Sequence, residues 1–232
     1  MRRVIINVTY ALLAGYILCY YSEWMFWGGS VRPAEFGEYL AAWLFYSFAT
    51  YLFLVTVYYF RVRSLWAMFL AGAVYGWLVE GVIVQTMYDD FPLNISTTGL
   101  SWHALISVLF GWYFLRRALR TSTAAALRVI LLLALYYGLW AHGWWSEGAV
   151  HDPSTLFVYF MQLGIPLLFA YLGLERLGDN AFRPTRWGMI VALLLLAAYY
   201  VFVTISGAAA GAADLAARAG VRAVLSAAQP PA

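Results

Sequence analysis

Four apolar segments each carry one glutamate or histidine in line with two small residues spaced four apart. The rows are Gly72, Gly76 and Glu80; His103, Ser107 and Gly111; Ala134, Gly138 and His142; and Gly15, Cys19 and Glu23. Residues four apart share one face of a helix, and small residues in membranes mark faces where helices approach closely. We therefore expect each glutamate or histidine to point toward other helices rather than lipid, and all four to meet at one site.

The chemistry expected of this site is that of an enzyme, with Glu80, His103 and His142 as catalytic residues and Glu23 as a further acid. One carboxylate and two imidazoles can hold a divalent metal ion and leave one position open for water. Without a metal, Glu80 can act as a general base while a histidine polarises the substrate. The chain has no H-E-x-x-H or G-x-S-x-G motif, so the metal interpretation depends on these residues alone.

Two other classes of function fit the same residues. His103 and His142 lie on neighbouring antiparallel segments at similar depth, so they could bind one b-type haem in a redox or quinol-handling subunit. Intramembrane acids and histidines also form proton relays, which suits a transport or assembly subunit with partners in a membrane complex. The other half of the predicted bundle offers no matching ionisable residue, which argues against a carrier.

The composition determines what kind of fold must position these residues. Of the 232 residues, 64% are hydrophobic and only 11% are charged, with a mean hydropathy of +0.75. A soluble domain is about 45–50% apolar and about 25% charged, so we expect a multi-pass membrane protein without a nucleic-acid partner. All 14 basic residues are arginine, which excludes Schiff-base chemistry and a phosphate-binding loop that needs lysine.

The hydropathy pattern predicts an all-α fold of seven transmembrane helices within residues 1–206, followed by an Ala-rich extracytoplasmic tail at residues 207–232. The expected spans are Val4–Trp27, Tyr39–Phe60, Leu65–Tyr88, Trp102–Leu115, Ala124–Trp145, Thr155–Leu174 and Trp187–Ser206. The fourth span is short, and we expect residues 97–101 to join it. Asp152 followed by Pro153 predicts an N-cap at the start of the sixth span.

The arginines predict the orientation of this bundle. With the N-terminus in the cytoplasm, that side receives Arg2, Arg3, Arg61, Arg63, Arg116, Arg117, Arg120, Arg128, Arg176, Arg183 and Arg186. Only Arg32, Arg218 and Arg222 then lie outside, which agrees with the positive-inside rule. We therefore expect a cytoplasmic N-terminus, an external C-terminus and a plasma (inner) membrane location.

This orientation also predicts the depth of the candidate site. Glu80, His103, His142 and Glu23 would all lie in the outer half of the bundle, where a cavity could admit a lipid, isoprenoid or peptide substrate from the outer leaflet. Glu147 and His151 follow in an outer loop, where we expect them to be solvated.

Overall fold

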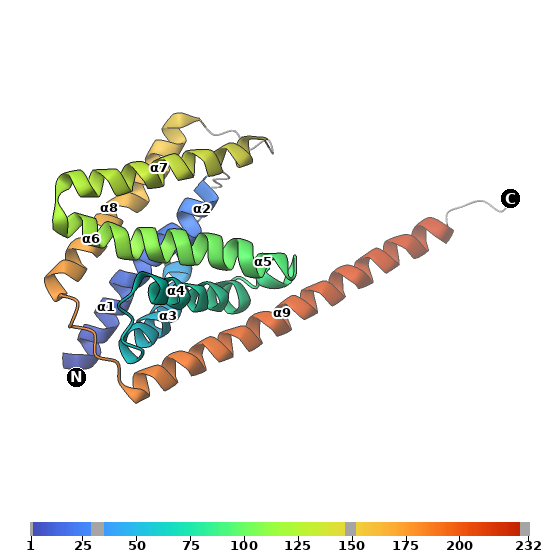
Figure 1. Ribbon diagram of the computed structural model, residues 1–232. Coiled ribbons are helices and arrows are strands. Elements are labelled where there is room, and N and C mark those ends of the chain that lie inside the picture. The colour runs from blue at the N-terminus through green and yellow to red at the C-terminus, as the bar shows by residue number, and fades with distance from the viewer. Residues whose placement is uncertain (1, 29–34, 147–151, 228–232) are drawn as a thin grey trace.

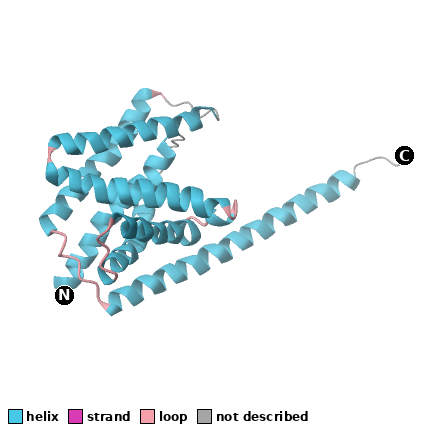
Figure 2. Ribbon diagram, viewed as in Figure 1, coloured by secondary structure: helices cyan, strands magenta, loops and turns pink. Residues whose placement is uncertain are grey.

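The computed structural model describes residues 2–28, 35–146 and 152–227, without the side chains of residues 144–146 and 208–227. This part of the chain is helical and contains no strand (Figure 2). The α-helices are α1 (Arg2–Cys19), α2 (Met25–Trp27), α3 (Phe36–Tyr59), α4 (Leu65–Leu78), α5 (Leu93–Ser96), α6 (Leu115–Thr121), α7 (Thr123–Ser146), α8 (Pro153–Leu177) and α9 (Arg186–Ala227). The intervening helical segments are η1 (Tyr20–Trp24), η3 (Val79–Ile83), η4 (Thr86–Tyr88) and η5 (Thr97–Phe114).

Seven helical stretches of the described chain are long and apolar enough to cross a membrane, which confirms the number expected from the sequence. They are Arg2–Trp27, Phe36–Tyr59, Leu65–Ile83, Leu93–Thr121, Thr123–Gly143, Pro153–Leu177 and Arg186–Gly207. The fourth is much longer than its apolar run, because residues 93–101 and 116–121 extend it at both ends; residues 97–101 belong to this extension, as expected. The protein is therefore a multi-pass, all-helical membrane protein.

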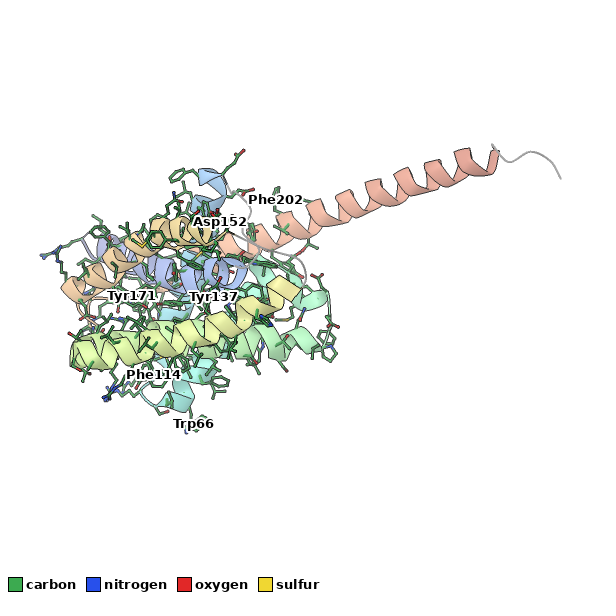
Figure 3. All side chains as sticks on the ribbon, turned by 90° about the horizontal axis from the view of Figure 1, so that it is seen from above. Trp66, Phe114, Tyr137, Asp152, Tyr171 and Phe202 are labelled. Atoms are coloured by element: carbon green, nitrogen blue, oxygen red, sulfur yellow. The ribbon has the colours of Figure 1, made fainter. Side chains whose placement is uncertain are left out.

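Spans one to four form an inner group, and spans five to seven form an outer group around it. Between 44% and 61% of the residues in the most apolar stretch of each inner span are buried, compared with 11% to 17% in the outer spans. Exceptions occur in both groups: Figure 3 shows Tyr171 of α8, an outer span, between helices, and Trp66 of α4, an inner span, at the edge of the molecule, where its side chain is exposed.

Close contact between helices depends on glycine in the inner group. A Cβ atom added at Gly76 of α4 would lie 2.3 Å from the carbonyl oxygen of Gly99 in η5, and one added at Gly15 of α1 would lie 2.2 Å from the hydroxyl of Ser47 in α3. By contrast, Gly138 of α7 has no heavy atom of another element within 4 Å of such a Cβ. The expected close approach therefore occurs in the inner group but not along this face of α7.

Three inner helices contain wide turns, in which each backbone N–H bonds the carbonyl five residues back instead of four. These turns are η1 in the first span, η3 in the third and η5 in the fourth. In η3, for example, the N–H of Val84 bonds the carbonyl of Val79 at 3.0 Å. Wide turns are rare and occur frequently at functional sites, and those of η1, η3 and η5 hold the residues considered below.

Local signals define the ends of the outer helices. The carboxylate of Asp152 accepts a hydrogen bond from the N–H of Thr155 at 3.2 Å, so the predicted N-cap of α8 is confirmed. Helix α9 passes residue 207 without a break and continues to Ala227, and Figure 1 shows its second half projecting beyond the other helices. The start of the Ala-rich tail is thus not a helix end.

Candidate functional site

A buried pair formed by Glu80 and His103 is the centre of the candidate site. The Nε2 atom of His103 lies 2.6 Å from Oε1 of Glu80, and only 2% of His103 and 5% of Glu80 are exposed. The second carboxylate oxygen accepts a hydrogen bond from the hydroxyl of Thr86. Both oxygens of this deeply placed acid are therefore engaged, which is the condition for keeping such a group inside a membrane protein.

The other ring nitrogen of His103 faces a serine that the sequence did not single out. Nδ1 of His103 lies 3.0 Å from the hydroxyl oxygen of Ser22, which is also 2.9 Å from the hydroxyl of Ser107 and 3.3 Å from that of Tyr75. Ser22 donates its one hydroxyl hydrogen to Ser107, so it can donate to Nδ1 of His103 only by giving up that bond. The imidazole is thus held between a carboxylate and a hydroxyl.

Helix packing accounts for the position of the pair. The third and fourth spans approach closely at Gly76, where an added Cβ would lie 2.8 Å from the Cβ of His103. Ser22, Glu80 and His103 belong to η1, η3 and η5, so each projects from a wide turn. An extra residue in a turn changes the direction of the side chains that follow, which α-helical spacing alone does not predict.

A short irregular segment after η3 places Thr86 against Glu80. The segment turns at Gln85, whose φ of 60° lies in the left-handed region that few non-glycine residues adopt. The side-chain amide of Asn94 then donates to the carbonyl of Thr86 at 2.8 Å and fixes the segment in place. Backbone strain of this kind clusters at functional sites.

The pair opens into a cavity of about 800 Å³ at one end of the bundle. Its aromatic walls come from Trp24, Phe26, Trp27, Tyr39, Trp102 and Tyr159, and its acids are Glu23, Glu38, Glu80 and Asp89. Among the described residues, those that line it include Ser22 and His103 but no arginine. An apolar cavity with a few converging polar groups is the usual form of a small-molecule site.

Glu23 reaches this cavity, as expected, and is held at its wall. Its Oε2 accepts a hydrogen bond from the hydroxyl of Tyr46 at 2.7 Å. Glu23 does not contact the Glu80–His103 pair through any hydrogen bond recorded in the described chain, so it is an acid of the cavity wall rather than a member of the pair.

His142 is not among the described residues that line this cavity. Ala134, Gly138 and His142 all lie on an exposed face of α7. The physical reason is that α7 belongs to the outer group, where this face has no helix packed against it at Gly138. Glu147 and His151 lie outside the described residues.

The donor set of the site does not match the metal or haem that the sequence suggested. Within the described chain, no group of three or more His, Cys, Asp or Glu side chains is placed to hold a metal ion. For a haem, His142 is exposed on α7 and both ring nitrogens of His103 have partners, so these histidines do not form an axial pair. A ligand to His103 would have to displace either Ser22 or Glu80.

The arrangement that remains is one for proton transfer. An imidazole oriented by a carboxylate on one nitrogen can accept a proton at the other nitrogen, where Ser22 lies. A nucleophile within hydrogen-bond reach of a base, with the base oriented by a third group, is the signature of an activated nucleophile. Sequence alone could have raised Ser22 only through its position next to Glu23, which is a weak signal.

No protein-family model, curated protein or solved structure matches the chain.

Proposed function

We propose that this protein is a membrane-embedded enzyme that transfers or hydrolyses acyl groups, with Ser22 as nucleophile, His103 as base and Glu80 as the acid that orients the base. The observation that carries the proposal is the position of the His103 ring, 3.0 Å from the Ser22 hydroxyl and 2.6 Å from the Glu80 carboxylate. The ring presents Nδ1 to the serine and Nε2 to the acid. Proton transfer requires only that one nitrogen accept while the other donates.

The reaction steps follow from these contacts. As the oxygen of Ser22 forms a bond to the carbonyl carbon of an ester or amide, its proton passes to Nδ1 of His103. When the bond from that carbon to the leaving group breaks, the alcohol or amine takes this proton from His103. Water then attacks the acyl–serine bond with the same base, which restores the Ser22 hydroxyl and releases a carboxylic acid. Glu80 accepts the hydrogen bond from Nε2 throughout and stabilises the imidazolium.

The walls of the cavity favour a lipid ester or an apolar peptide as substrate. Six aromatic side chains line about 800 Å³ of space beside the pair, which suits an acyl chain or apolar side chains. The nucleophile needs an electrophilic carbonyl carbon, so a lipid ester fits the site better than an unsubstituted isoprenoid. The surrounding bilayer supplies both the substrate and a route to the cavity.

The proposal also covers the orientation of the helix bundle in the membrane and the membrane in which the protein lies. The cavity lies at the end of the bundle that carries Glu38 and Asp89, and Arg116 and Arg120 lie at the other end. The positive-inside rule then places the N-terminus in the cytoplasm and the cavity toward the outer leaflet of a plasma (inner) membrane.

A fluorophosphonate probe tests the proposal without knowledge of the substrate, because it reacts with activated serines. We expect it to label Ser22 of the detergent-purified protein, as located by peptide mass spectrometry. Labelling should be lost in Ser22→Ala and His103→Ala, and it should slow at least about 100-fold in a folded Glu80→Gln protein. Ser101→Ala is the matched control. Ser101 is an exposed serine of η5, the helix that holds His103; its hydroxyl donates to the backbone carbonyl of Ser96 and does not touch His103.

Two outcomes would overturn the proposal. One is the absence of labelling at Ser22 in folded wild-type protein, and the other is labelling that persists at the wild-type rate in His103→Ala. Either result would favour the two other functions named above, a proton relay or an assembly subunit whose partner supplies the chemistry.

A further inference from the structure

A second cavity, of about 490 Å³, lies at the end of the bundle opposite to Glu80. Three arginines line it, namely Arg116, Arg117 and Arg120, together with one acid, Asp179. The hydroxyl-bearing side chains of Tyr10, Tyr58, Tyr113 and Thr121 also line it, as do apolar residues. This composition is the reverse of that of the first cavity, where the lining residues that the structure describes include four acids and no arginine.

The most informative residue of the second cavity is Arg116. Its side chain is only 9% exposed, and its guanidinium carbon lies 4.2 Å from the centre of the Trp112 ring. One terminal nitrogen donates to Asp179 at 2.8 Å. The Nε–H of Arg116, however, is buried and has no hydrogen-bond partner among the described residues. A buried donor without an acceptor is costly, so this position calls for an acceptor from outside the chain.

The arginines also outnumber the acids that neutralise them. Arg120 donates from Nε to both carboxylate oxygens of Glu175 at 2.8 Å and also pairs with Asp179. The guanidinium of Arg117 is exposed and has no ion pair within the described chain. The positive charge of Arg117 is therefore left over beside the cavity, and the Nε–H of Arg116 is left without an acceptor.

We propose that this cavity binds a phosphate-type oxyanion, carried either by the head group of an anionic phospholipid or as free phosphate. Arginine matches the oxygen atoms of phosphate with donors in a fixed geometry, and the ring of Trp112 holds the Arg116 guanidinium in place. The site lies at the ends of the fourth and sixth spans, at the level where lipid head groups meet protein. Leu54, Val57 and Met68 line the same cavity and would contact the glycerol or the acyl chains.

Native mass spectrometry and calorimetry on the detergent-purified full chain test this site. The probes are phosphatidylglycerol, zwitterionic phosphatidylcholine and inorganic phosphate. We expect phosphatidylglycerol to bind at least tenfold more tightly than phosphatidylcholine. Arg117→Gln, which changes an exposed residue and should fold normally, should weaken this binding about tenfold, and Arg116→Gln should abolish it. Arg128→Gln is the control, because Arg128 is exposed on α7 and does not line the cavity.

The two sources of phosphate are separated by the probes. Tight binding of phosphatidylglycerol but not of inorganic phosphate assigns the site to a lipid head group. Binding of inorganic phosphate that weakens in Arg117→Gln assigns it to a free oxyanion. The inference is overturned if neither phosphatidylglycerol nor inorganic phosphate binds. It is also overturned if binding of these probes is the same in Arg117→Gln as in the wild type and in Arg128→Gln.

Discussion

The inner and outer groups of spans treat the same kind of residue differently. In the fourth span, His103 follows Gly99 and lies beside Gly76, in contact with Glu80 and Ser22 from two other helices. In the fifth span, His142 follows Gly138 at the same spacing but lies on an exposed face. The difference teaches that a row of small residues gives close helix contact only where a second helix lies against it, and that this contact determines which polar groups meet.

The largest expected effect comes from removing the inner histidine. His103→Ala leaves the buried carboxylate of Glu80 without its main hydrogen-bond partner, and leaving a buried charged group unsatisfied in this way costs more than about 3 kcal/mol. His142→Ala should lower the free energy of unfolding by distinctly less, because His142 is exposed on α7 and its removal leaves no buried carboxylate behind. Titration with sodium dodecyl sulfate, followed by circular dichroism, measures both. Equal losses in the two variants would remove the distinction between the groups.

A smaller effect is expected at the glycines of the two rows. Gly76→Ala puts a Cβ 2.3 Å from the Gly99 carbonyl oxygen, so α4 and η5 must separate at a cost of about 1–3 kcal/mol. Gly138→Ala meets nothing within 4 Å and should stabilise α7 by up to about 1 kcal/mol, because alanine favours helix more than glycine does. The same unfolding titration should give opposite signs for the two variants. Two changes of the same sign would contradict the packing described above.

The smallest expected effect lies in the loop between α8 and α9, and it depends on pH. Hydrogen bonds from Arg120, with the nearby charge of Arg116, lower the pKa of Asp179 below its ordinary value of 3.8. The unfolded chain therefore binds this proton more readily, so the stabilisation is fully present above pH 3.8 and disappears as the pH falls through the lower pKa of the folded protein.

Asp179 is partly exposed, so this stabilisation should amount to no more than about 0.2–1 kcal/mol. Asp179→Asn should be less stable than the wild type by that amount at pH 7, and the difference should close at acid pH. The melting temperatures of the two proteins between pH 7 and pH 3 provide the measurement. A gap that widens on acidification would show that Asp179 acts through some other contact.

Much of the fold could be predicted from the sequence because its signals are local. The seven spans follow from the hydropathy of single segments, and the cap at Asp152 follows from two adjacent residues. The lengthening of the fourth span by residues 97–101 follows from the thickness that any span must cross. The sequence also singled out Glu80 and His103 as candidates, because an acid and a histidine on small-residue faces are costly unless they have partners.

The composition of the site was decided by the tertiary structure. Ser22 became a partner of His103 because η1 lies beside η5, and no spacing within one helix predicts a contact between residues 81 positions apart. His142 does not line the cavity because its face of α7 is exposed, and no described residue approaches that face at Gly138. The wide turns at Ser22, Glu80 and His103 aim these side chains, and they follow from packing rather than from residue type. Apolar length by itself determined how many times the chain can cross the membrane, and contacts between helices determined which of its polar groups meet.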